Sequence, residues 1–397
     1  MGFGFSWFKR NRKKNDSELN YLIEVVSSDD IPARINLAHE LGCFVAEQDN
    51  SRKEKESLKP VFEFLTSDAE INVQVSLAKA ICQSKHVLPR GIVFKIAAEG
   101  CEEAASILLK QSPLMSEKLM KHLVLKNDDF RHKCISDRAG LSADLSLLLI
   151  KHSDEDVLVH LLHNDSADID EAGYRLLLTR FPDSAVVCDL IGERPGLPAV
   201  VSEILVSLAT DRMRDAAIDR GWMEESVADE MAMDLREKFT LEIAEKHNAE
   251  DGLKLVHALH QSKRLTPSLL LRAACCNNMR FVEDGMTKIS RLPIDRVVEL
   301  LYSGPMGVGA VAARAGFDAA STLILTFAFE VHQEMHFFKE DQSSANFAKR
   351  LIERVLNQST ELDEFEQKKL LNLMKRFTEG DNKVLAEEVI EAMDKAA

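Results

Sequence analysis

The chain has 397 residues, of which 45% are hydrophobic and 29% are charged, and its formal net charge at pH 7 is −15. This composition is that of a soluble folded protein, and no apolar run reaches the roughly 18 residues of a membrane-spanning helix. The chain contains few glycines, prolines, tyrosines and tryptophans and many leucines, alanines, glutamates and lysines. This composition favours an all-α fold over a β-rich one.

The charge is unevenly distributed along the chain. Residues 1–14 contain five bases and no acid, so the remainder carries about −20 (−15 minus +5). Such an acidic body is a poor general ligand for nucleic acid, and we expect no nucleic-acid partner. The seven cysteines are scattered, form no CxxC pair and follow no secretory signal. We therefore expect reduced thiols in a cytoplasmic protein.

The first 15 residues place four aromatic side chains directly before the five bases. Aromatic rings at the lipid headgroups and bases attracted to anionic lipid together make a peripheral tether to the inner face of the membrane. The alternatives are a protruding N-terminus without contacts and an aromatic cap on the first helices. The nine residues concerned are Phe3, Phe5, Trp7, Phe8, Lys9, Arg10, Arg12, Lys13 and Lys14.

A helical pattern with a long period follows. Ser28-Asp29-Asp30 and Ser67-Asp68-Ala69 each precede an apolar helical pattern, and the two phrases lie 39 residues apart (29 to 68). This length is typical of the helix pairs of HEAT-like repeats. Shorter repeats begin at Leu88, 26 residues before Leu114.

Between residues 114 and 208 a short sequence motif, which we call the phrase, recurs at a nearly constant interval. Its apolar anchors are Leu114, Leu141, Ile169 and Leu197, which are 27, 28 and 28 residues apart. That interval is too short for a βαβ unit but sufficient for two short antiparallel helices. We predict an all-α, HEAT-like helical-repeat solenoid of stacked antiparallel helix pairs.

Residues beside the anchors indicate how each helix begins and ends. Ser142 and Asp170 are suited to cap a helix N-terminus, whereas Pro198 fits a first turn. Gly140 and Gly196 precede their anchors and fit a left-handed turn that ends the previous helix. The same pattern of helix-terminating and helix-initiating residues around an apolar anchor recurs further along the chain, in Leu265-Thr-Pro, Leu292-Pro and Arg314-Ala-Gly-Phe317.

Four segments are expected from these patterns. The phrase is lost between residues 221 and 238, where the run is acidic and forms either a helix or a linker, so we place a lobe boundary there. The segments are a flexible aromatic and basic N-terminus (1–15), a first repeat lobe (16–220), a second repeat lobe (221–340) and a C-terminal helical cap (341–397). The alternative for the cap, which contains three amphipathic patterns, is an interaction module.

Two patterns resemble ligand sites but lack essential parts. His332 and His336 share a helix face, as in a zinc protease, but Glu334 comes one residue later than the zinc-protease signature requires and projects from the face opposite to His332. The glycine-rich run from Gly304 to Gly309 has neither the preceding strand nor the following lysine of a phosphate-binding loop. We expect no metal, no cofactor and no catalytic residues.

Three acids occupy the same place in successive repeats, each four residues before an anchor: Asp137, Asp165 and Glu193. Arg138 and Arg194 adjoin two of them. Stacked helices would align the acids along one edge, which we interpret as a surface for a basic or mixed-charge segment of a protein partner. The alternative is that these residues make local caps or solvated ion pairs.

The repeats resemble those of an uncharacterised helical-repeat family, the alphaproteobacterial domain-of-unknown-function family 2336. The resemblance is carried by Ser112-Pro-Leu114, Arg138-Ala-Gly-Leu141, Arg194-Pro-Gly-Leu197, Leu265-Thr-Pro-Ser-Leu-Leu-Leu271 and Arg291-Leu-Pro293. It implies the repeat fold and a cytoplasmic compartment, and it supplies no catalytic residues.

The function expected from these observations is a non-enzymatic scaffold or adaptor that binds a protein partner through a helical-repeat surface. An alternative is a peripheral-membrane regulatory protein that is recruited by its N-terminus. An enzyme of unknown type is the third and least favoured hypothesis, because triads assemble from distant positions but nothing in the sequence recommends one.

Overall fold

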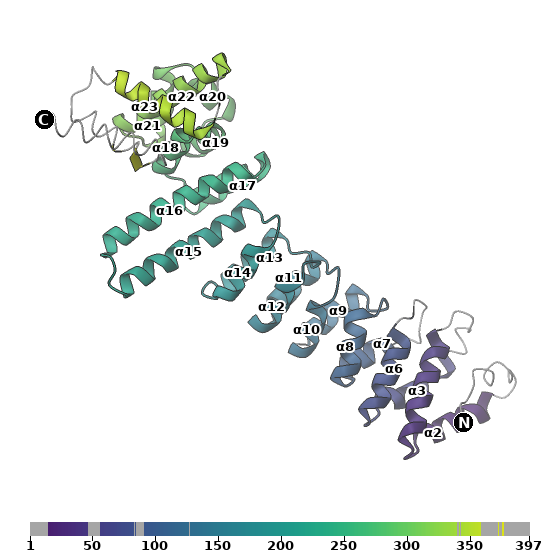
Figure 1. Cartoon of the computed structure of the whole chain (residues 1–397). Helices are drawn as coiled ribbons and strands as arrows, with labels where there is room; N and C mark the ends of the chain where they lie inside the picture. The colour runs from purple at the N-terminus through teal and green to yellow at the C-terminus, as the bar shows by residue number, and fades with distance from the viewer. Residues whose placement is uncertain are drawn as a thin grey trace. The chain divides into compact units, whose positions relative to one another are not determined.

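The structure is a computed structural model, shown in Figure 1, and it describes residues 15–46, 56–82, 84, 91–126, 128–339, 341, 343–358, 372, 375 and 376. Its described residues form α-helices joined by turns, with no strand among them, which confirms the predicted all-α helical-repeat fold. The chain divides into two compact units, residues 1–195 and 196–397.

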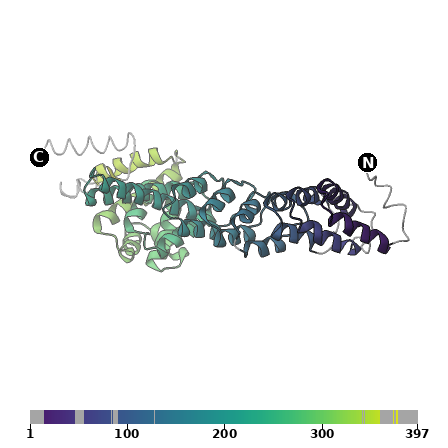
Figure 2. The same ribbon diagram turned by 90° about the horizontal axis from the view of Figure 1, so that it is seen from below.

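The first unit stacks its helices in two rows (Figures 1 and 2). In one row α9, α11 and α13 contact one another in succession, and in the other, row B, α6, α8, α10, α12 and α14 do so. The helices of this unit are α2 (Asn15–Val26), α3 (Ile31–Ala46), α5 (Lys59–Thr66), α6 (Ile71–Cys82), α7 (Ile92–Glu99), α8 (Glu102–Gln111), α9 (Glu117–Val124), α10 (Asp129–Ser136), α11 (Ala143–His152), α12 (Glu155–His163), α13 (Glu171–Arg180) and α14 (Ala185–Glu193).

Local chemistry explains where these helices begin and end. Ser142 accepts a hydrogen bond from the Leu145 amide at 3.4 Å, and Asp170 accepts one from the Gly173 amide at 2.8 Å. Both therefore cap a helix N-terminus, as predicted. Gly140 and Gly196 have φ angles of 70° and 71°, the left-handed conformation that the sequence indicated before each anchor.

The repeats are joined through backbone carbonyls at helix C-termini. Arg138, just after α10, donates hydrogen bonds to the carbonyls of Leu109 (2.9 Å) and Ser112 (2.8 Å) at the end of α8. One repeat later, Asn164 donates to the carbonyls of Ser136 and Arg138, both at 2.7 Å. The last carbonyls of a helix have no partner within it, and side chains of the next repeat supply donors to those of α8 and α10.

Arg194 makes the most extensive of these connections. Its guanidinium donates to the carbonyls of Leu162 (3.1 Å), Asn164 (3.1 Å) and Ala167 (2.7 Å), and its Nε donates to the Tyr174 hydroxyl at 2.9 Å. A guanidinium has five N–H donors in a planar fork, and its charge is favoured at the negative end of a helix dipole. Arg194 thus ties α14 to the C-terminus of α12.

The second unit begins with two helices about twice as long as those of the repeats. Its elements are α15 (Ala199–Asp219), α16 (Glu225–Lys246), α17 (Ala249–Gln261), α18 (Pro267–Cys275), α19 (Met279–Ser290), α20 (Ile294–Leu301), α21 (Pro305–Ala315), α22 (Ala319–Phe338) and α23 (Ser344–Gln358). The acidic run between residues 221 and 238, for which the sequence indicated either a helix or a linker, lies largely in α16. This helix packs along α15 (Figure 1). The predicted lobe boundary at 220/221 falls in the turn between these two helices.

Helix α18 is the centre of the second unit. All seven residues from Leu269 to Cys275 are buried, and α18 contacts α16, α19, α22 and α23. Helix α23 contains the first amphipathic pattern of the predicted C-terminal cap. The other two patterns of that cap lie outside the described residues, apart from positions 372, 375 and 376.

We predict that Arg194→Ala lowers the free energy of unfolding by about 2–4 kcal/mol, because it leaves several backbone carbonyls without their donor. Far-UV circular dichroism of the full chain in urea measures the change. The matched control is Arg175→Ala, which removes one exposed i,i+4 ion pair with Glu171 and is expected to cost about 0.5 kcal/mol or less. Equal losses in the two variants would contradict a structural role for Arg194.

Candidate functional site

The three acids singled out in the sequence lie at the C-terminal ends of consecutive row B helices. Asp137 directly follows α10, Asp165 lies two residues beyond α12, and Glu193 is the last residue of α14. We call these three residues the acidic edge. A helix C-terminus carries a partial negative charge, so a carboxylate there loses stability, typically about 0.3–1 kcal/mol.

Asp137 is compensated by two neighbouring repeats. Its carboxylate accepts from Lys110 Nζ of α8 at 2.8 Å and lies 3.0 Å from His160 Nδ1 of α12. Burial raises the pKa of Asp137, but the hydrogen bonds from Lys110 and His160 outweigh burial, and the pKa lies below its ordinary value. Asp137 therefore links α8, α10 and α12 and is only partly available to a ligand.

Asp165 and Glu193 are exposed. No hydrogen bond or ion pair to either carboxylate occurs among the residues that the structure describes. Asp165 and Asp137 line one shallow hollow with His160 and His163, together with Val159, Asn164 and Ser166. Stacking thus places the acids of two repeats at one surface, while Glu193 lies one repeat further along row B.

The arginines next to the acidic edge are used by the fold. Arg138 and Arg194 direct their guanidiniums to backbone carbonyls of the preceding repeat. Burial lowers the pKa of Arg138, although Cys82 opposes this shift. The prediction that these two arginines also contact a partner has no support from this arrangement, and it stays a prediction.

Sequence reasoning missed the partners of Asp137. Lys110 and His160 are separated from it by 27 and 23 residues (137 minus 110, 160 minus 137), which is about one repeat on each side. Only the repeat period could have indicated them, and that period does not say which way a side chain points.

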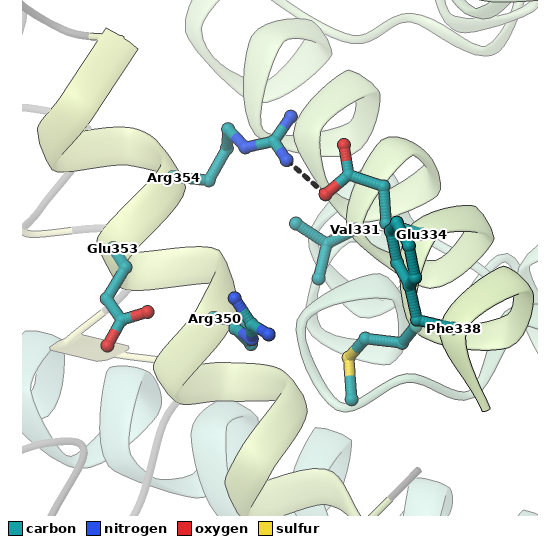
Figure 3. A pocket seen from close by; sticks show the side chains of 7 residues that line it. Val331, Glu334, Phe338, Arg350, Glu353 and Arg354 are labelled. Atoms are coloured by element: carbon teal, nitrogen blue, oxygen red, sulfur yellow. Dashed lines mark hydrogen bonds and ion pairs between the residues drawn. The ribbon is translucent and has the colours of Figure 1, made fainter. Parts of the chain in front are cut away.

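A second hollow lies in the second unit between α22 and α23 and has a volume of about 210 Å³. Figure 3 shows Arg354 directed at Glu334, and Arg354 also pairs with Glu330 at 3.2 Å. The hollow is lined by Val331, Glu334, Met335, Phe338, Arg350, Glu353 and Arg354. Because acids and bases are balanced in it, this hollow has no clear preference for a charged ligand.

Two aromatic side chains are exposed at the end of α22. Phe337 and Phe338 are 81% and 67% exposed and meet edge to face with ring centroids 5.2 Å apart. Among the described residues, His332 and His336 belong to no group of three or more possible metal ligands. His332 Nδ1 lies 2.8 Å from Asn277 Oδ1, and burial, with a smaller effect of His336, lowers the pKa of His332.

Among the described residues, no group of three or more histidines, cysteines or acids is placed to hold a metal ion. None of the helices that the structure describes has the length and apolarity to cross a membrane. The nine residues of the predicted membrane tether, from Phe3 to Lys14, lie outside the described residues.

The family model of an uncharacterised protein conserved in bacteria (DUF2336) matches residues 104–363. No curated protein and no solved structure matches the chain. The matched segment contains the acidic edge, α15, α16 and the hollow of Figure 3.

We predict that Asp137→Asn destabilises the protein at pH 7 by about 1 kcal/mol or less, because the ion pairs that it removes are partly exposed. The pKa of Asp137 is lower in the folded chain, so its contribution is present above the unfolded value and is lost as the pH falls below about 4. Urea unfolding from pH 7 to pH 2.5 measures the difference between variant and wild type.

The control for this series is Asp144→Asn, whose carboxylate is 81% exposed and pairs with Lys121 on the other row. We expect a smaller effect for it at every pH. A difference between Asp137→Asn and wild type that stays constant down to pH 2.5 would show that the charge of Asp137 contributes nothing.

Proposed function

We propose that this chain, which belongs to the uncharacterised bacterial family DUF2336, is a non-enzymatic scaffold or adaptor that binds a protein partner through the helical-repeat surface of its first unit. The observation that carries the proposal is the position of Asp165 and Glu193. Both carboxylates are exposed at helix C-termini, where the helix dipole makes a negative charge unfavourable. Residues that cost stability and stay exposed are candidates for binding.

The chemistry of the acidic edge favours a basic or mixed-charge segment of the partner. The exposed carboxylates of Asp165 and Glu193 lie on successive repeats of row B, so lysine and arginine side chains of a partner are attracted along this edge. Charges at a wet surface mainly steer association and select partners, and salt weakens them. The proposal requires no catalytic group and no cofactor.

Asp137 is better left unchanged in a test, because its loss would also disturb the contacts with Lys110 and His160. We predict that the double variant Asp165→Lys/Glu193→Lys loses at least one partner that the wild-type chain retains. Affinity capture from the native host with quantitative mass spectrometry measures this, and we expect a decrease of about tenfold or more, equivalent to about 1.4 kcal/mol.

The matched control is Asp144→Lys/Glu171→Lys, which introduces the same change of charge on α11 and α13 of the other row. Both control residues are in surface ion pairs, with Lys121 and Arg175. The partner lost by the first variant is expected to remain bound to the control. Retention of every partner by both folded variants would remove the acidic edge from the proposal.

The second proposal is a peripheral-membrane regulatory role at the cytoplasmic face of the inner membrane. It rests on the sequence of the N-terminus, where Phe3, Phe5, Trp7 and Phe8 precede five bases without an acid. Rings at the headgroup level and bases attracted to anionic lipid act together, and neither alone anchors a protein firmly.

For this role we predict that the full chain sediments with anionic vesicles and that deletion of residues 1–14 abolishes sedimentation. Increasing salt from 50 to 500 mM is expected to weaken binding, because it screens the attraction between the bases and the lipid. A variant with serine at the four aromatic positions keeps the bases and tests the rings separately. Identical sedimentation of full-length and truncated chains would exclude the tether.

A further inference from the structure

Exposed apolar side chains are concentrated on the long helical pair of the second unit. Seven large hydrophobic residues between positions 213 and 239 are exposed: Met213, Trp222, Met223, Val227, Met231, Met233 and Phe239. Exposed apolar side chains gathered in one region mark binding surfaces more often than chance. The side of α16 that faces α15 is different, since its buried residues there include Ala228 and Ala232.

One stripe of α16 combines apolar and acidic residues. Val227 and Met231 lie at i and i+4 in α16 and are 49% and 46% exposed, and Met223, which is 38% exposed, lies two residues before the first residue of the helix. Glu230 and Asp234 lie on the same side, one turn apart. We call these five residues the α16 stripe. Methionine adapts its shape to apolar partners, and flanking acids select basic ones.

The stripe already holds a basic side chain from a distant part of the chain. Arg376 Nε donates to Asp234 Oδ1 at 3.3 Å, and Arg376 Nη1 lies 4.0 Å from Glu230 Oε1. Arg376 also lines a hollow of about 290 Å³ with Val227, Met231 and three other residues of α16. A guanidinium therefore lies where the acids and the apolar side chains of the stripe meet.

Asp234 and Glu237 have a second, structural task. Both pair with Arg272 of α18, which is 4% exposed, and Glu237 also accepts from Ser268 at 3.2 Å. Burial raises the pKa of Glu237, although Arg272 opposes the shift. These acids neutralise a buried cation, whereas the Glu230 side chain is 71% exposed and lies 4.0 Å from Arg376.

The sequence around Arg376 fits the chemistry of the stripe. Residues 368–377 are Lys-Lys-Leu-Leu-Asn-Leu-Met-Lys-Arg-Phe, which combines four bases with five apolar residues. Residues 372, 375 and 376 are helical in the structure. A basic amphipathic helix that binds an acidic, methionine-containing face is a known mode of recognition between helices.

We propose that the α16 stripe is a docking surface for a basic amphipathic helix, and that its occupant is the chain's own C-terminal segment, anchored in cis by Arg376. The segment covers an interaction surface of the second unit. This inference does not depend on the acidic edge, which belongs to the first unit, and either proposal can fail without the other.

A charge swap in the full chain tests the ion pair. Arg376→Glu and Glu230→Lys should each increase amide hydrogen exchange in residues 223–235 and hydrogen-peroxide oxidation of Met231 by about two- to fivefold, the range expected for a partly exposed ion pair. The double variant Glu230→Lys/Arg376→Glu should return both rates close to those of wild type. Met213 on α15, which is 62% exposed, is the internal control and should not change.

A synthetic peptide of residues 362–378 tests the surface itself. We expect it to bind the full-length Arg376→Glu variant at least about fivefold more tightly than wild type, because the cis segment no longer competes. The same peptide with glutamate at positions 375 and 376 should not bind. Equal affinity for both chains, or no binding to either, would overturn the proposal, as would unchanged exchange and oxidation rates in both single variants.

Light scattering over a range of concentrations tests whether docking occurs in cis. A monomer whose Met231 oxidation rate is independent of concentration supports the proposal. A dimer that dissociates in Arg376→Glu would assign the occupant to a second copy and overturn docking in cis.

Discussion

The last carbonyl groups of a helix have no donor within that helix, and in the first unit the next repeat supplies one. Arg138, Asn164 and Arg194 do this for α8, α10 and α12 in turn. Helices of eight to ten residues leave a large share of their backbone groups unpaired at the ends, so a stack of them depends on such donors. Hydrophobic contacts bring the rows together, and these hydrogen bonds set the register between repeats.

This constraint also shapes the surface. Arg138 and Arg194 are directed into the stack and, among the described residues, form no ion pair with the acids beside them. Asp137 receives Lys110 and His160 instead, while Asp165 and Glu193 stay exposed. At these helix ends the arginines therefore lie toward the stack, and the carboxylates of Asp165 and Glu193 lie at the surface.

In the second unit, acidic side chains of α16 pair with arginines. Asp234 and Glu237 face the buried Arg272, and Glu230 and Asp234 face Arg376 on the outer side of α16. One helix thus contributes both to an internal ion cluster and to an exposed stripe. A variant of Asp234 would affect both, which is why Glu230 is the better residue for separating docking from folding.

Much of the fold was predictable because its determinants are local. Helix caps at Ser142 and Asp170 and left-handed glycines at 140 and 196 act within four residues of the chain, and the 27 to 28 residue interval between anchors is visible in the sequence. The sequence by itself therefore determined an all-α repeat protein and the position of the acidic edge within each repeat. Side-chain direction and pairing across repeats were decided only by the tertiary structure. Packing alone places Lys110 and His160 on Asp137, exposes Phe337 and brings Arg376 to Asp234 over a separation of 142 residues, because these contacts depend on how helices stack in space and leave no periodic signal in the chain.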